Sequence, residues 1–156
     1  MTGDSFVKGE RAGAPSGTIG DRFVTPSRTI GEEDIMSFAE LTGDMHPQHT
    51  DAEWAAGSRF GERIAHGLLV QSCAVGLVDF DPDRVLALRR VGDAVFKLPV
   101  RIGDSVHVEG QTLRTRELDD ETELVEYRWR VLNQDGRMVL RMNVEVVCRR
   151  DAVPAS

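Results

Sequence analysis

The sequence lacks the features that would associate it with nucleic acid or a membrane. It carries 19 lysines and arginines against 26 aspartates and glutamates, for a net charge of −7. Because phosphate binding requires a clustered basic surface, we expect no nucleic-acid partner. No run of about 18 apolar residues could span a membrane, and the N-terminus does not show the basic-then-apolar order of a secretion signal.

Cysteine is also scarce. Cys73 and Cys148 are the two in the chain, and both stand in apolar surroundings. A disulfide between them is not required, and a pair of reduced thiols is the simpler interpretation. We therefore expect a cytoplasmic protein.

The residues that are present are enough for one domain. The chain has 156 residues, of which 40% are hydrophobic and 29% charged, an ordinary globular mixture. Residues 1–20 are rich in glycine, serine and alanine and predict a flexible N-terminal arm. Residues 151–156 predict a frayed C-terminus. A single domain is therefore expected over residues 21–150, with no internal repeat or linker.

The first half of this domain has helical periodicity. Thr29 and Glu32 predict a capping box at the start of the amphipathic segment "EEDIMSFAEL". The segment "DAEWAAG" predicts a short helix capped by Thr50 or Asp51. Residues 64–78, "IAHGLLVQSCAVGLV", are apolar on almost every side, which predicts a helix surrounded by protein on every side.

From Arg84 onward the apolar period changes to two, which is typical of strands with one apolar face. "ELVEYRWRVL" and "RMVLRMNVEVV" alternate in this way, and "NQDG" predicts a hairpin turn between them. "DSVHVEGQTLRTR" and "RVLALRRVGDAVFKLP" predict two further strands.

The apolar face of an antiparallel sheet has to be buried against another element, and the apolar helix has to be buried as well. We therefore expect an α+β hot-dog fold, an antiparallel sheet wrapped around a long central helix. A plain α+β sandwich with its helices side by side on the sheet fits the same periodicity.

Two blocks within residues 28–77 form a motif, "FAELTGDMHPQHTD" and "FGERIAHG". With this motif the segment, about a third of the chain, resembles the MaoC-like dehydratases, which include the R-specific enoyl-CoA hydratases. The resemblance implies one hot-dog MaoC-like domain over residues 21–150. The positions in register are Phe38, Thr42, Gly43, Asp44, Pro47, His49, Asp51, Phe60, Gly61, Ile64, Ala65, His66 and Gly67.

One position departs from the family pattern. The family has asparagine, a residue that braces the loop, where this chain has His46. Histidine donates and accepts hydrogen bonds as asparagine does, but it is larger and it titrates. We expect the departure to affect pocket shape and pH response more than activity, so that His46→Asn keeps activity.

Hydration of an enoyl thioester needs a base, an acid and a group that holds the charge on the thioester oxygen. Asp44 and His49 lie five positions apart across a proline turn, so both can face one cleft. By resemblance they hold the water and move its proton, and the backbone N–H of Gly67 holds the oxyanion. The resemblance also places six residues at the substrate: His46, Pro47, Phe60, Ile64, Ala65 and His66.

Each of these residues also has a structural interpretation. Asp44 can cap the turn after the first helix, and His49 can be a hydrogen-bonded loop histidine. His66 can set the helix start through a backbone hydrogen bond, which is the favoured interpretation. Gly67 can be a close-packing glycine, and Phe60 can be a core aromatic residue.

A metal site is the other interpretation of the loop, because Asp44, His46, His49 and Asp51 are close together in the sequence and are zinc-ligand types. Pro47 opposes the regular helix that would align the histidines, and no second cluster supplies a further ligand. We therefore expect no metal.

The predicted protein is a hydratase/dehydratase that converts a 2-enoyl thioester and an (R)-3-hydroxyacyl thioester into each other. It needs no cofactor, because coenzyme A enters as part of the substrate. By resemblance it is a homodimer or a higher homo-oligomer. A non-catalytic acyl-thioester-binding subunit and an acyl-CoA thioesterase on the same fold are the alternatives. The acyl chain stays open, and a dicarboxylic one would need a cation such as Arg59 or Arg63.

Overall fold

The computed structural model describes residues 15–150. Its helices are α1 (Glu32–Thr42), α2 (Pro47–Thr50), α3 (Ala52–Ala56) and α4 (Gly67–Leu77). Its strands are β1 (Arg22–Val24), β2 (Arg28–Thr29), β3 (Val85–Phe96), β4 (Ser105–Glu117), β5 (Thr122–Asn133) and β6 (Met138–Arg149).

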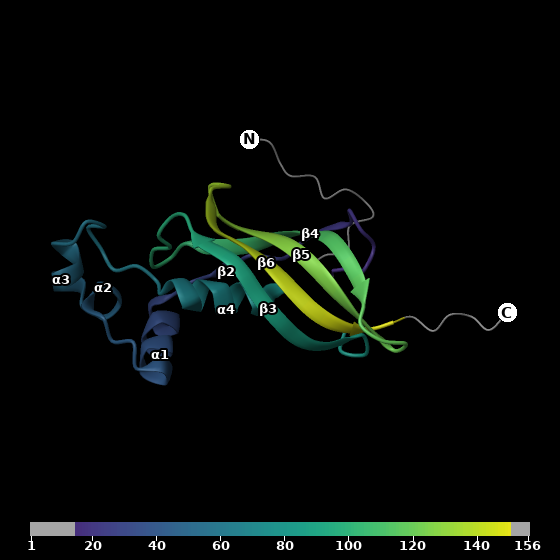
Figure 1. Cartoon of the computed structure of the whole chain (residues 1–156). Coiled ribbons are helices and arrows are strands. Elements are labelled where there is room, and N and C mark those ends of the chain that lie inside the picture. The colour runs from purple at the N-terminus through teal and green to yellow at the C-terminus, as the bar shows by residue number, and fades with distance from the viewer. Residues whose placement is uncertain (1–14, 151–156) are drawn as a thin grey trace.

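The strands form one antiparallel sheet in the order β1-β4-β5-β6-β3, and β2 pairs with β4 beside β1. The sheet curves around α4, while α1, α2 and α3 lie beyond one end of that helix (Figure 1). This arrangement confirms the predicted α+β hot-dog fold over the side-by-side sandwich.

The hairpin between β5 and β6 follows from its turn residues. The side-chain oxygen of Asn133 accepts hydrogen bonds from the amides of Asp135 and Arg137, each at 3.0 Å. Gly136 has φ of 71°, in the left-handed region that glycine adopts without a steric cost. The predicted turn at "NQDG" is therefore confirmed.

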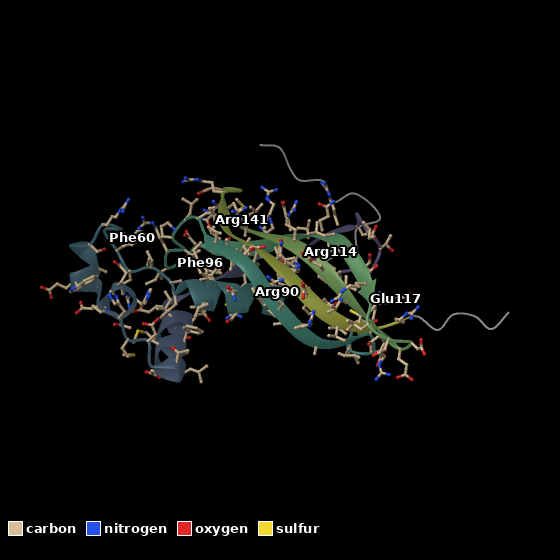
Figure 2. All side chains as sticks on the ribbon, viewed as in Figure 1. Phe60, Arg90, Phe96, Arg114, Glu117 and Arg141 are labelled. Atoms are coloured by element: carbon tan, nitrogen blue, oxygen red, sulfur yellow. The ribbon has the colours of Figure 1, made fainter. Side chains whose placement is uncertain are left out.

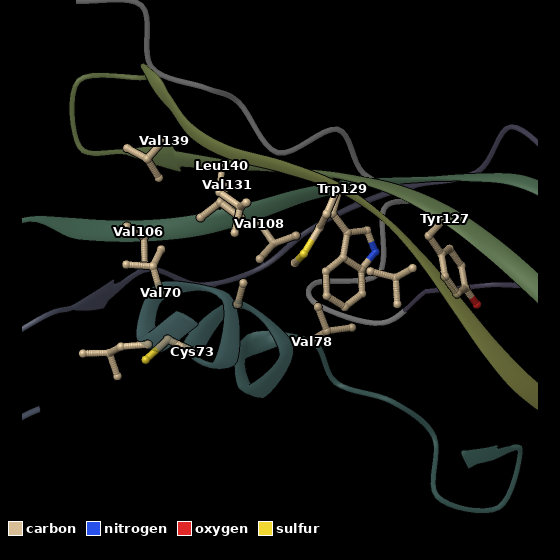
Figure 3. Packing of buried hydrophobic residues seen from close by; sticks show 14 of the residues in the cluster. Val70, Cys73, Val78, Val106, Val108, Tyr127, Trp129, Val131, Val139 and Leu140 are labelled. Carbon is tan, nitrogen blue, oxygen red and sulfur yellow. The ribbon is translucent and has the colours of Figure 1, made fainter. Parts of the chain in front are cut away.

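The core lies between α4 and the concave face of the sheet. Val70 of α4 points toward the apolar side chains of β4, β5 and β6, with Trp129 fully buried among them, while Cys73 lies on the side of the helix away from these strands (Figure 3). Phe23 of β1 meets the Trp129 ring edge-on, with 6.2 Å between ring centroids. A Cβ atom at Gly110 would lie 2.1 Å from the Phe23 ring, so this glycine makes room for the aromatic cluster.

The central helix differs from its prediction in two respects. It begins at Gly67, because the three residues before it are held extended: Ile64 bridges to Arg101, and the Ala65 amide donates to the Val100 carbonyl at 2.7 Å. Moreover, Leu68 on its outer side is 60% exposed. The expectation of protein on every side of the helix is therefore wrong for a single chain.

The predicted capping box at Thr29 is also wrong. Thr29 pairs with Ser105 as part of β2, so its backbone continues the sheet edge. Helix α1 begins two residues later with Gly31 as its N-cap, and the Asp34 carboxylate accepts the Gly31 amide at 2.8 Å. A carboxylate in the first turn also suits the positive end of the helix.

The end of the predicted N-terminal arm lies on the sheet. The Thr112 hydroxyl donates to the Ser16 carbonyl at 2.8 Å, and the Gly20 amide donates to the Thr112 carbonyl at 2.9 Å. The rest of the arm and the predicted frayed C-terminus, residues 151–156, lie outside the described residues. Within residues 15–150, no helix is long and apolar enough to cross a membrane.

Candidate active site

The candidate site begins where α1 ends. Gly43 adopts φ of 79° and its amide donates to the Ala39 carbonyl at 2.8 Å, which ends the helix at this glycine. The chain then passes through Asp44, which is exposed, into the single turn of α2 that carries His49. Pro47 occupies the first helical position, where its missing N–H has no cost.

His49 is held by one backbone group. Its Nδ1 lies 2.7 Å from the Ile64 carbonyl oxygen. A carbonyl oxygen only accepts, so Nδ1 carries the proton and Nε2 of the neutral ring keeps a free lone pair. Burial is the largest influence on the pKa of His49 and lowers it, while the bond to Ile64 raises it by less. His49 is therefore neutral near pH 7, as a general base should be.

His66 contacts both Asp44 and His49. It is 2% exposed, and its Nε2–H donates to the backbone carbonyl of Asp44 at 2.9 Å. Its ring stacks on the His49 ring, with 3.9 Å between centroids and 28° between planes. Phe38 packs on the His66 ring at 5.0 Å. His66 thus fixes both the Asp44 backbone and the His49 ring.

The reactive groups come close together. One carboxylate oxygen of Asp44 and one ring nitrogen each of His49 and His66 all lie within 4.8 Å of one another. This separation between Asp44 and His49 allows one water molecule to hydrogen-bond to both. The two residues can therefore share the water that a hydration reaction consumes.

The same three groups have the types of atoms that bind a metal. However, the His49 and His66 rings are stacked at 28° between planes, so their in-plane lone pairs lie in nearly parallel planes, an arrangement that does not favour two ligands converging on one ion. Of the residues considered from the sequence, Asp51 accepts the Trp54 amide at 3.0 Å. His46 accepts the Gln48 amide at 3.1 Å. The expectation of no metal stays a prediction.

Gly67 is the first residue of α4, so its amide has no acceptor within the helix and lies at the positive end of the helix dipole. A Cβ atom at this position would lie 2.8 Å from the Phe96 ring. Both the close-packing interpretation and the oxyanion interpretation of Gly67 thus have structural support.

A cavity of ≈ 470 Å³ opens beside Gly67. Phe60, Ile64 and Ala65 line it, while His46, Pro47 and His66 do not. The rest of its lining is Leu68, Val70, Phe96, Lys97, Leu98, Pro99, Val100 and Val139. Phe60 and Phe96 lie at the same end of the molecule in Figure 2. Asp44 and His49 are not among the lining residues, but Ile64 lines the cavity and its carbonyl accepts the hydrogen bond from His49. Ile64 therefore connects the cavity to His49.

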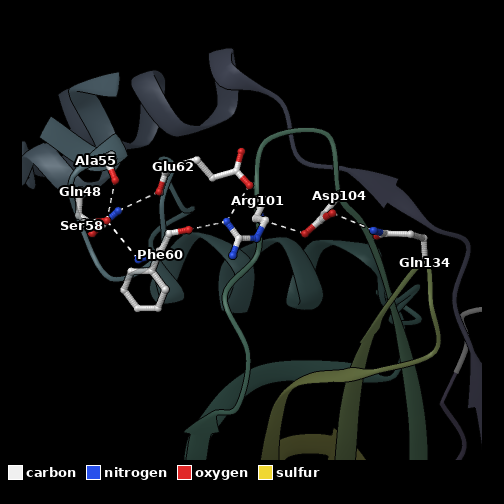
Figure 4. A network of polar contacts seen from close by, with 8 residues as sticks. All are labelled: Gln48, Ala55, Ser58, Phe60, Glu62, Arg101, Asp104 and Gln134. Carbon is white, nitrogen blue, oxygen red and sulfur yellow. Dashed lines mark hydrogen bonds and ion pairs between the residues drawn. The ribbon is translucent and has the colours of Figure 1, made fainter. Parts of the chain in front are cut away.

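A polar network holds the segment between α3 and α4 (Figure 4). Arg101 donates to the Phe60 carbonyl at 2.9 Å and to the Glu62 carboxylate at 2.6 Å. The buried side chain of Gln48 donates to the Glu62 carbonyl at 3.0 Å. Neither Gln48 nor Arg101 is predicted as a site residue from the sequence, because a lone arginine and a loop glutamine give no sequence signal of these contacts.

With this geometry in view, comparison with known proteins identifies the family. The model of the MaoC like domain matches residues 15–134. The chain belongs to the MaoC-like dehydratase family.

Relatives of this MaoC-like chain include enzymes. It is 39% identical over 90 residues to the 3-hydroxybutyryl-CoA dehydratase of Methylorubrum extorquens, covering 53% of this chain and 52% of that enzyme. It is 33% identical over 91 residues to the (R)-specific enoyl-CoA hydratase of Aeromonas caviae, covering 58% and 68%. The chain thus spans about half or less of the length of the first curated relatives that it matches.

Solved structures show the same fold. The monoamine oxidase regulatory protein of Archaeoglobus fulgidus superposes with a TM-score of 0.81 at 35% identity, covering 86% of this chain and 92% of that one. The (R)-hydratase of A. caviae superposes with a TM-score of 0.68 at 28% identity, covering 83% and 95%.

Proposed function

We propose that this MaoC-like protein is a hydratase/dehydratase that converts a 2-enoyl thioester into an (R)-3-hydroxyacyl thioester, or the reverse. The observation that carries the proposal is a neutral His49 with a free Nε2, one of whose ring nitrogens lies within 4.8 Å of an Asp44 carboxylate oxygen. The names of the dehydratase and hydratase relatives support the same chemistry.

The proposed reaction uses few groups. Nε2 of His49 removes a proton from the water held between it and Asp44, and the oxygen bonds to the β-carbon of the substrate. The electron pair of the double bond moves toward the thioester oxygen, which the Gly67 amide stabilises. The His49 imidazolium then delivers its proton to the α-carbon, which restores the neutral base and the thioester.

The cavity supports an acyl thioester as substrate. Its lining is mostly apolar, which suits a fatty acyl chain, with Lys97 as the one cation among its lining residues. Coenzyme A is the proposed carrier and enters with the substrate, so no separate cofactor is proposed. Arg63 pairs with Glu32 at 2.5 Å, which argues against a role in binding a dicarboxylic substrate.

A homodimer is the proposed assembly. Strand β3 pairs only with β6 among the described strands, which leaves one edge of the sheet open. This strand exposes Leu86, Leu88 and Phe96 at 45–49%, and Leu68 of α4 shares the cavity with Phe96. These exposed apolar side chains on an open edge suit an interface, and we propose that a second copy covers them.

The decisive experiment is hydration of crotonyl-CoA and longer 2-enoyl-CoA thioesters, followed by loss of the conjugated thioester absorbance, with chiral analysis of the product. Asp44→Asn and His49→Ala should each lower the rate by about 10²–10⁴-fold. His107→Asn on β4 is the matched control and should keep the wild-type rate.

Three results would contradict the proposal. Full activity in either variant would remove the mechanism. Release of free thiol from acyl-CoA would identify a thioesterase. Binding of acyl-CoA without turnover of any enoyl chain would identify a non-catalytic binding subunit.

A further inference from the structure

His46 accepts the backbone donors of the turn that carries His49. The Gln48 amide donates to its Nδ1 at 3.1 Å, the His49 amide donates to its carbonyl at 2.9 Å, and the Thr50 amide donates to the same carbonyl at 3.3 Å. Pro47 has no amide hydrogen. The amide donors of α2 therefore all end on this one residue.

The side-chain bond makes His46 the N-cap of α2. Asparagine, aspartate and serine normally fill this role with an oxygen that accepts at any pH near neutrality. Here the acceptor is the Nδ1 lone pair of an imidazole, which a proton can occupy. The His46 ring is exposed, so solvent protons reach it, and Trp54 of α3 packs edge-on against it at 5.5 Å.

We propose that His46 is a positioning residue that holds His49 in its reactive position only while its own Nδ1 is unprotonated, so that acid releases the catalytic turn. This inference rests on the proposed function and deepens it. Protonated Nδ1 would direct a hydrogen at the Gln48 amide hydrogen, so the ring must rotate away and the turn loses its side-chain cap.

The charged surroundings of His46 come from three elements. From the preceding loop, an Asp44 carboxylate oxygen lies 3.4 Å from the His46 backbone amide. On α2, the His49 ring lies 6.0 Å away. On α3, Asp51 is engaged with the Trp54 amide, and Glu53 follows it. As a residue type, histidine changes charge between about pH 5 and pH 8.

The substitutions separate capping from titration. His46→Asn supplies an oxygen acceptor that does not titrate, while His46→Ala supplies none. At about pH 8, the upper end of the range in which histidine side chains change charge, His46→Asn should keep kcat within about twofold and His46→Ala should lose roughly fivefold. In acid, the wild type should lose a further factor of roughly five relative to His46→Asn. His107→Asn should follow the wild-type pH profile.

A second readout does not depend on turnover. In a pH titration by NMR, the Gln48 amide proton should shift with the same midpoint as the His46 ring in the wild type, and should not follow this titration in His46→Asn. This measurement tests the capping role of His46 even if the protein hydrates no enoyl thioester. Absence of hydration would instead contradict the proposed function.

Two results would overturn the inference. One is a Gln48 amide that does not follow His46. The other is a pair of superimposable kcat–pH profiles for the wild type and His46→Asn, which would show that the cap does not position His49.

Discussion

The Nδ1–H of His49 donates to the carbonyl of Ile64 at 2.7 Å, and Ile64 also lines the cavity beside Gly67. One residue thus joins the helical turn that carries the proposed base to the segment that leads into α4. The proposed base and the proposed oxyanion donor are therefore positioned together, and a change in the position of either segment should shift the other.

A substitution at Gln48 tests this connection between α2 and the segment that leads into α4. Its side chain is buried and donates to the Glu62 carbonyl, and its own carbonyl accepts the Ile64 amide at 3.2 Å. Gln48→Ala leaves the Glu62 carbonyl without its partner and should lower the free energy of unfolding by about 1–3 kcal/mol. It should also lower kcat, measured with crotonyl-CoA.

The matched control for that change is Gln134→Ala. Gln134 also bonds both a backbone amide and a side chain, those of Ser105 and Asp104, but at an exposed turn far along the sequence. It should change the unfolding free energy by less than about 1 kcal/mol and leave the rate intact. Equal effects of the two variants would contradict a special role for Gln48.

The packing role and the proposed oxyanion role of Gly67 can be separated by substitutions at Gly67 and Phe96. Gly67→Ala places a Cβ atom 2.8 Å from the Phe96 ring and should cost about 1–3 kcal/mol of stability by overpacking. The double variant Gly67→Ala/Phe96→Ala removes this contact and should recover melting temperature relative to Gly67→Ala. Its rate should stay below that of Phe96→Ala alone, because the new methyl group hinders approach to the amide. Recovery of both quantities would leave Gly67 with a packing role only.

The pKa of His49 predicts the pH dependence of stability. Burial lowers this pKa below its ordinary value of 6.5, so between that value and the folded value the unfolded chain binds more protons. The contribution of His49 to stability should therefore be constant above pH 6.5 and fall as the pH drops below it. Denaturant unfolding from neutral to acid pH should show a steeper loss for the wild type than for His49→Gln. Parallel curves would show that the pKa is not lowered.

The proposed dimer predicts the effect of charge on β3. Leu88 is 49% exposed on this open edge strand, and Leu88→Lys should convert the assembly to monomers in sedimentation velocity. Leu118, which is 42% exposed just beyond β4, is the control, and Leu118→Lys should not alter the sedimentation coefficient. A wild-type chain that sediments as a monomer would remove the proposed assembly.

Much of the fold could be predicted from local pattern. The period of two along β5 and β6 and the turn residues at Asn133 and Gly136 define the hairpin without long-range information. The start of α4 could not be predicted in this way. Ile64 forms a β-bridge with Arg101 instead of joining the helix, and nothing in the apolar run of residues 64–78 indicates a partner so far along the chain.

The candidate site divides in the same way. The motif selected Asp44, His49 and Gly67, and spacing across Pro47 suggested that the first two share a cleft. The tautomer of His49 and the stacking of His66 on it depend on where the Ile64 and Asp44 carbonyls lie in space, which the sequence does not encode locally.

The bond between the Ala65 amide and the Val100 carbonyl has a consequence for protein synthesis. Translation runs from the N-terminus, so Asp44, His49 and Gly67 leave the ribosome before Val100 and Arg101 are made. A nascent chain at that stage carries the reactive side chains but lacks the partners that fix the start of α4. The proposed activity on a thioester should therefore arise only after the β3–β4 connection has emerged and docked.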